Sequence, residues 1–370
     1  MANDEKITEA TMPTEVADTG HEAVMRPWFC VALSPTGSIL RKNRESVNDL
    51  MEMINDAAIC WVDYVARDFE KELPAVAGQF GFNPQLIADL TGESRSTYRD
   101  YETELGMKIP SVQVTNLEVE PNLLVILLKK NLVFTIHPLN IDRRFTRLRR
   151  YAETVLKKIP HEANPEDRLT MLLMRIIDEN NSWNSEHLRE IEEKGDKLNE
   201  SMIDPYTPRN KLGPEIYHMK HALIIYLNAL WDAVHVLHAL HYGDAELITN
   251  DAKLVDKLGL LAEDVNRQIS LAEHMSEVLA SGLEVLQSIY NNQLQNLNNR
   301  MALLMAYLTI IGTAVLVPNT LATMLGNSVF DIGPKDLGWY LALMIGSTVV
   351  ATVAVYWWVK RRGWIPKKMD

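Results

Sequence analysis

Uncharged polar side chains gather at and within a long apolar stretch near the C-terminus. The amides lie between Tyr290 and Arg300: Asn291, Asn292, Gln293, Gln295, Asn296, Asn298 and Asn299. The apolar run that follows, residues 301–325, has no acidic or basic side chain but contains Thr309, Thr313, Asn319, Thr320 and Thr323. Carboxamides and hydroxyls exchange hydrogen bonds with a hydrated ion without holding it as a carboxylate does. These residues favour a wet path for ions, and the alternative is a polar helix surface at a membrane edge.

A second group of candidate ligands lies on one predicted helix. Asp232, His235 and His238 recur every three residues within the stretch LWDAVHVLHALHY. Carboxylate and neutral imidazole are zinc ligands, so these three side chains are a candidate metal site. A spacing of three drifts around a helix, however, and the stretch is otherwise apolar, which fits a packed helix equally well. The sequence shows no phosphate-binding loop, no nucleophile with its base and no HExxH, so we predict that the chain is not an enzyme.

The elements that must position the polar residues are membrane spans. Residues 301–325 are long enough to cross a bilayer, which takes about 20 helical residues. A second uncharged run, residues 337–359, follows a short loop, residues 326–336, so the two runs predict an antiparallel hairpin. Basic residues follow the second run at Lys360, Arg361 and Arg362. Because basic residues stay in the cytoplasm, we expect a multi-pass protein of the plasma (inner) membrane with both termini cytoplasmic.

The charge of the chain is divided unevenly. The net charge is −12 over 370 residues, whereas residues 301–370 hold six Lys or Arg and three Asp or Glu, which leaves −15 for residues 1–300. An acidic body disfavours nucleic acid as a partner and favours cations. The two cysteines, Cys30 and Cys60, are too few for a disulfide framework and suit a reducing compartment.

The chain divides into segments of different pattern. We predict a disordered, polar tail without a signal peptide over 1–25, an α/β cytosolic domain over 26–140 and a helical region over 141–250. A stalk helix over 251–300, a first span over 301–325, a loop over 326–336, a second span over 337–359 and a basic tail over 360–370 complete the chain. Within the α/β domain we expect strands near Trp28 and at 57–65, helices at 68–80 and 84–92, and a three-stranded meander with turns at Pro121-Asn122 and Lys130-Asn131.

The helical region predicts long elements. The pattern places helices at 143–158, 165–202 and 214–242, and a last helix that begins near Asp251 and meets no strong breaker before Pro318. Two spans per chain cannot enclose a water-filled path, so a channel built from this chain requires a ring of subunits. The first span, which carries the Thr and Asn residues, would line the path, and the second would face lipid.

The sequence resembles the CorA family of pentameric divalent-cation channels. Successive landmarks are WVD at 61–63, FGFNPQLIADLTG at 80–92, TYRDYE at 97–102 and KNLVFTIHP at 130–138. NNRMALLMAYLTIIGTAVLVPNTL resembles the stalk and pore helix of that family, and AVYWWVKRRGW its outer helix and basic tail. The resemblance implies a cytosolic α+β funnel domain (an α/β/α sandwich), a long stalk helix and two C-terminal transmembrane helices, assembled as a homopentamer.

The resemblance also implies where the pore lies. The Gly-Met-Asn motif at the outer mouth of the family's pore is replaced here by Gly326, Asn327 and Ser328, and Leu325 stands where the family has an aromatic residue. Met305 and Leu308 match the hydrophobic gate, and Asn319 matches a pore threonine. The implied pore-lining set is Met301, Met305, Leu308, Thr309, Leu316 and Asn319.

Regulation is implied by the same resemblance. Asp89 matches an acid that binds a regulatory cytosolic Mg²⁺ between subunits, and its stalk partner is Asp264 or Glu263. We therefore expect a passive channel for Mg²⁺, which would be both the transported ion and the regulatory ion. The expected partners of the chain are other copies of itself and membrane lipid, and not nucleic acid. The altered mouth keeps two alternatives open: transport of Zn²⁺, Co²⁺ or Ni²⁺, and a non-conducting, membrane-tethered cation sensor.

Overall fold

The structure is a computed structural model that describes residues 28–43, 47–91, 97–204, 207–243, 245–326 and 333–362. The chain forms two compact units, Met1–Leu279 and Ala280–Asp370, and the long helix α7 (Ala252–Leu325) contributes residues to both. The predicted disordered tail at 1–25 lies outside the described residues. Each unit is taken by itself below.

A seven-stranded sheet organises the first unit. Its strand order is β2-β1-β3-β7-β6-β5-β4, with β3 and β7 parallel and the other neighbours antiparallel. The strands are β1 (Trp28–Leu33), β2 (Ile39–Asn43), β3 (Ile59–Ala66), β4 (Tyr98–Asp100), β5 (Leu105–Thr115), β6 (Glu118–Lys129) and β7 (Leu132–Pro138). The central strands β3 and β7 are apolar over most of their length because helices cover both faces of the sheet.

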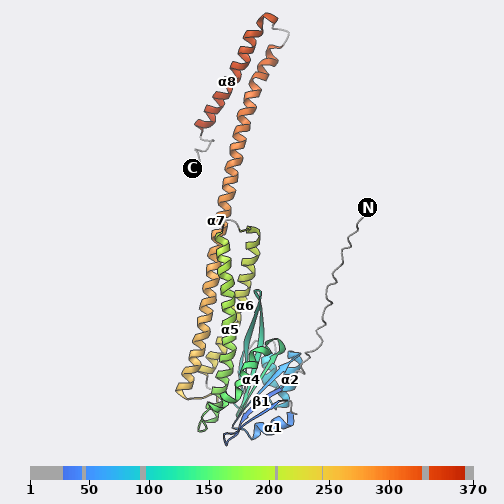
Figure 1. Ribbon diagram of the computed structural model, residues 1–370, viewed down its shortest axis with the longest axis vertical. Helices are drawn as coiled ribbons and strands as arrows, with labels where there is room; N and C mark the ends of the chain where they lie inside the picture. The colour runs from blue at the N-terminus through green and yellow to red at the C-terminus, as the bar shows by residue number, and fades with distance from the viewer. Residues whose placement is uncertain are drawn as a thin grey trace, which may run out of the picture. The chain divides into compact units, whose positions relative to one another are not determined.

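Helices α1 (Val47–Asn55), α2 (Phe69–Gln79) and α3 (Pro84–Thr91) cover one face of the sheet. Side chains alternate between the faces of a strand, so Cys60 and Val62 of β3 join Phe134 and Ile136 of β7 in the core beneath these helices. Trp61 and Asp63 point to the opposite face, where α4 (Asp142–Lys157) packs. The fold is therefore the predicted α/β/α sandwich (Figure 1).

Two long helices complete the second face. Helix α5 (Pro165–Ile203) begins with Pro165 and two acids in its first turn, which suit a helix N-terminus, and it contacts β5. Helix α6 (Arg209–Tyr242) packs on α5, β5 and β6. By length and composition alone, α6, α7 and the segment Pro334–Arg361 are each apolar enough to cross a membrane. Half of the most apolar stretch of α6 is buried, so we assign α6 to the core of the first unit.

The second unit is a helical hairpin. It contains the C-terminal part of α7, the short helix η2 (Pro334–Asp336) and α8 (Leu337–Arg361), which lies alongside α7 (Figure 1). None of the most apolar stretch within Pro334–Arg361 is buried in a single chain. Its exposure is that of helices whose surroundings are lipid and neighbouring subunits rather than water.

Most predicted elements are confirmed, and one hairpin is wrong. The helices expected at 68–80, 84–92, 143–158 and 165–202 match α2 to α5 closely, and α7 passes Pro318 without a break. The turn between the first two strands of the meander lies at Asn116 and Leu117, not at Pro121-Asn122 as predicted. Asn116 and Leu117 have positive φ angles of 52° and 70°, as a tight hairpin turn requires. Pro121 instead pairs with Val112 inside the ladder. The short elements β2, α1 and β4 had no recognised signal, and α6 starts at Arg209, before the expected Pro214.

Candidate functional site

Five of the predicted pore residues form one stripe on α7. Successive helical residues are rotated by about 100°, so Met301, Met305, Leu308, Leu316 and Asn319 fall within an arc of about 80°. The first four have exposed fractions of 55%, 63%, 73% and 62%, and Asn319 is also exposed. We call these five residues the pore stripe. It is a continuous face that its own chain leaves uncovered.

The opposite side of α7 faces α8. The less exposed residues of this part of α7 include Leu303, Ala306, Ile310 and Val317, and Ala306 is only 8% exposed. On α8 the less exposed residues recur at the same spacing and end at Val359, which is 1% exposed. The pore stripe therefore points away from the only helix that packs on this part of α7 among the described residues of the second unit. Thr309 lies at the margin of the stripe.

Gly326 directly follows the end of α7 at Leu325. Its N–H donates to the carbonyl of Ala322 at 2.8 Å, and a side chain at this position would come within 3.0 Å of the same oxygen. A glycine is therefore suited to the close backbone approach at the helix end. The other two residues of the predicted mouth, Asn327 and Ser328, lie outside the described residues.

The predicted regulatory acid Asp89 already has partners in its own chain. Its carboxylate accepts hydrogen bonds from the Tyr101 hydroxyl at 3.0 Å and from the Gln85 amide at 3.0 Å. The Arg99 guanidinium lies 3.5 Å away, and the Asp89 side chain is 27% exposed. A cation that binds this carboxylate must therefore compete with Arg99.

One of the two stalk candidates, Asp264, lies on an open groove between α5 and α7. Asp264 forms an ion pair with Arg267 one turn along the helix, and Glu263 is exposed beside it. Asp264 lines a groove of about 750 Å³ that also contains Asn181 and Gln268. Buried polar atoms of these two amides lack partners among the described residues, so this groove contains unsatisfied hydrogen-bonding groups as well as acids.

The three residues of the histidine helix do not converge. Asp232, His235 and His238 are all exposed on α6. Burial lowers the pKa of Lys108 on β5, and the negative charge of the nearby Asp232 carboxylate acts in the opposite direction. Among the described residues, no three His, Cys, Asp or Glu side chains form a group that could hold a metal ion.

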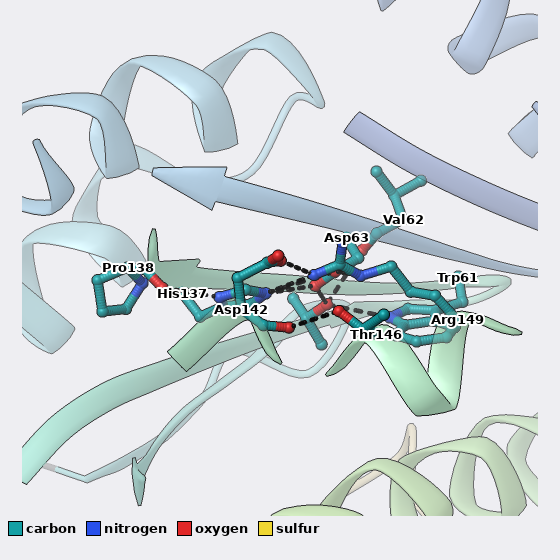
Figure 2. A network of polar contacts seen from close by, with 9 residues as sticks. Trp61, Val62, Asp63, His137, Pro138, Asp142, Thr146 and Arg149 are labelled. Atoms are coloured by element: carbon teal, nitrogen blue, oxygen red, sulfur yellow. Dashed lines mark hydrogen bonds and ion pairs between the residues drawn. The ribbon is translucent and has the colours of Figure 1, made fainter. Parts of the chain in front are cut away.

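A buried ionic network joins the sheet to α4 (Figure 2). The Asp63 carboxylate, on β3, lies 2.7 Å from Nε of Arg149 and accepts a hydrogen bond of 2.5 Å from Thr135 on β7. Arg149 also pairs with Asp142 at the start of the same helix. Asp63, Thr135 and His137 are fully buried. This network fixes α4 on the sheet.

The charge balance of the network determines the ionisation of Asp63. Burial alone raises the pKa of this carboxyl, but the Arg149 guanidinium, the His137 ring and the hydrogen bonds from His137 and Thr135 lower the pKa to about 2. Asp63 is therefore ionised at neutral pH, and its charge is balanced inside the protein.

The WVD at 61–63 carries the family resemblance, but this network was not predicted from it. Its partners are separated by more than seventy positions along the chain. A second buried network was missed for the same reason: Arg144 on α4 donates to Oδ1 of Asn184 on α5 at 2.9 Å and to the Val112 carbonyl on β5. Burial lowers the pKa of Arg144 to about 10, which leaves it charged at neutral pH. The only signal available in sequence was a polar residue in an apolar context.

Comparison with known proteins places the chain in a family. The family model described as "CorA-like Mg2+ transporter protein" matches residues 56–361. The chain is also similar to the complete structure of the CorA magnesium transporter from Methanocaldococcus jannaschii, with 20% sequence identity and a TM-score of 0.65 over 91% of this chain and 98% of that chain. No curated protein matches the chain.

Two further solved structures share the fold. The ZntB cytoplasmic domain from Vibrio parahaemolyticus is 14% identical, with a TM-score of 0.53 over 72% of this chain and 100% of that domain. The full-length CmaX protein is 15% identical, with a TM-score of 0.57 over 93% of this chain and 99% of that chain.

The family match and the apolar hairpin define a membrane ion transporter. The chain belongs to the CorA-like Mg²⁺ transporter family. Members of this family transport divalent cations and are not enzymes. The resemblance recognised in the sequence and the predicted fold class are confirmed.

Proposed function

We propose that this chain assembles into a homopentameric channel through which Mg²⁺ flows passively across the plasma membrane. The observation that carries the proposal is the pore stripe, which is exposed and points away from α8. A helix face at membrane depth that combines apolar residues with a carboxamide needs neighbouring copies around it. A ring of α7 helices with α8 on the lipid side provides them.

The residues of the stripe have distinct roles in this proposal. Met301, Met305 and Leu308 form the cytoplasmic, hydrophobic part of the path, where a constriction gates by excluding water. Gly326, Asn327 and Ser328 form the outer mouth. Lys360, Arg361 and Arg362 stack on Tyr356, Trp357 and Trp358, an aromatic and basic border that supports a cytoplasmic C-terminus.

Regulation by cytosolic Mg²⁺ fits the acids of the first unit. The Asp89 carboxylate of one subunit and Asp264 or Glu263 of the next supply the oxygen ligands that Mg²⁺ prefers. Arg99 and Arg267 neutralise two of these acids when no cation is bound. Closure of the channel therefore requires a Mg²⁺ concentration high enough to displace the two arginines from the carboxylates. When Mg²⁺ dissociates, the arginines pair with the carboxylates again.

Uptake by proteoliposomes tests the proposal. Purified protein is reconstituted with a Mg²⁺-sensitive dye inside the vesicles, and parallel samples receive Zn²⁺, Co²⁺ or Ni²⁺ with matching dyes. Mg²⁺ entry supports the proposal. Entry of Zn²⁺, Co²⁺ or Ni²⁺ without Mg²⁺ would instead assign the chain to transition-metal transport. No uptake of any of the four ions by intact oligomers would favour the non-conducting cation sensor.

A further inference from the structure

The exposed face of α4 is basic, although the body that carries it is acidic. The charged residues that are exposed on α4 and at its C-cap are all cations: Arg143, Arg147, Arg150, Lys157 and Lys158. Of the two acids in the helix, Asp142 pairs with Arg149. The other, Glu153, lies 3.7 Å from Arg41 of β2. A surface of a single sign indicates an anionic partner.

A groove between α4 and α5 adjoins this basic face. Its volume is about 670 Å³, within the size range of small-molecule sites. The lining includes the buried, apolar side chains of Leu148 and Ile159 and the ring of Tyr151, which is 54% exposed. Arg147 and Lys158 of the basic face line the same groove. The groove therefore combines an apolar surface, an accessible aromatic ring and cations.

A buried carboxylate positions two of the cations that line the groove. Glu179 on α5 is 5% exposed and lies 3.5 Å from Arg175 and 3.8 Å from Arg147. Asp178 balances Arg175 from 2.7 Å. The Arg147 side chain is 69% exposed, so its guanidinium, which has five N–H donors, keeps donors for a ligand. Lys158 has no acidic partner among the described residues, which leaves the groove positively charged.

We propose that this groove binds a nucleoside triphosphate. Guanidinium groups bind phosphate oxygens through paired hydrogen bonds and an ammonium group adds a point charge, so Arg147 and Lys158 hold the phosphates. The base stacks on Tyr151 and covers the apolar lining. Inorganic phosphate would leave the ring and the apolar lining uncovered, and the net charge of the body disfavours a nucleic acid.

Isothermal titration calorimetry of the full chain in detergent tests the inference, with ATP as the probe and EDTA present to remove Mg²⁺. We expect saturable binding of one ATP per chain. Lys158→Gln should weaken the affinity at least about tenfold, because one hydrogen bond to a charged group is lost. Tyr151→Ala should weaken it at least about fivefold, because the base loses its stacking partner. The measurement follows binding and not flux, so its outcome does not depend on the proposed function.

Arg150→Gln is the matched control. Like Lys158, Arg150 is an exposed cation of α4 without an acidic partner among the described residues, but it does not line the groove. Its loss should change the affinity less than about twofold, because salt screens charges outside the site. Circular dichroism checks that each variant is folded.

Three results would overturn the inference. Equal weakening by Lys158→Gln and Arg150→Gln would show only a general attraction of anions to the basic face. Tripolyphosphate that binds as tightly as ATP would show that the nucleoside is not recognised. Absence of saturable ATP binding to the parent would show that the groove is not a nucleotide site.

Discussion

Replacement of Asp63 by Asn removes the charge at the centre of the buried network. The pKa of this carboxyl drops from its ordinary 3.8 to about 2 in the folded protein, which corresponds to about 2.5 kcal/mol of stability at neutral pH. Arg149 keeps Asp142 as a partner after the substitution, so the cost should stay near the lower end of the 3–5 kcal/mol range typical of a broken buried ion pair. We expect Asp63→Asn to lower the free energy of unfolding by about 3 kcal/mol.

The assay is urea unfolding of the full chain in detergent, followed by circular dichroism. Asp178→Asn is the matched control, because Asp178 also lies 2.7 Å from an arginine, Arg175, but its side chain is 45% exposed. An exposed pair contributes at most about 1 kcal/mol. Equal losses in the two variants would refute the reasoning that burial of the network, rather than ion-pair distance, sets its energy.

The same carboxyl predicts a pH dependence. Its pKa is lower in the folded protein than in the unfolded chain, so its contribution is present above about pH 4 and is lost as pH falls towards 2. The parent should lose stability over this interval more steeply than Asp63→Asn. Parallel curves for the two proteins would show that Asp63 does not titrate as its surroundings require.

Three further outcomes follow from other residues. Leu308→Asp should raise resting Mg²⁺ leak into proteoliposomes several-fold, because a charged ring hydrates the constriction, and an unchanged leak would contradict its position in the path. Asp89→Lys should abolish inhibition of flux by cytosolic Mg²⁺, and persistent inhibition would remove Asp89 from regulation. Asn184→Ala should lower the free energy of unfolding by about 2 kcal/mol, since Arg144 and the Val112 N–H lose their acceptor; a thermal melt identical to the parent's would contradict this.

The membrane hairpin and most long helices could be predicted from the sequence because their signals are local. The spans at 301–325 and 337–359 follow from composition, and helix periodicity is set by residues three or four apart. Short edge elements such as β2 and β4 carried too few residues for a pattern. The hairpin at Asn116-Leu117 was missed because Pro121 and Asn122, residues typical of turns, lie in a strand beside it.

The sequence by itself determined the class of molecule: the two spans, the acidic body and the pore stripe, whose spacing puts it on one face of any helix. Only the tertiary structure decided what each polar group contacts. Asp63 on β3 pairs with Arg149 on α4, and Asp89 on α3 pairs with Arg99 on β4. Such contacts depend on how elements pack in three dimensions, and separation along the chain carries no information about them.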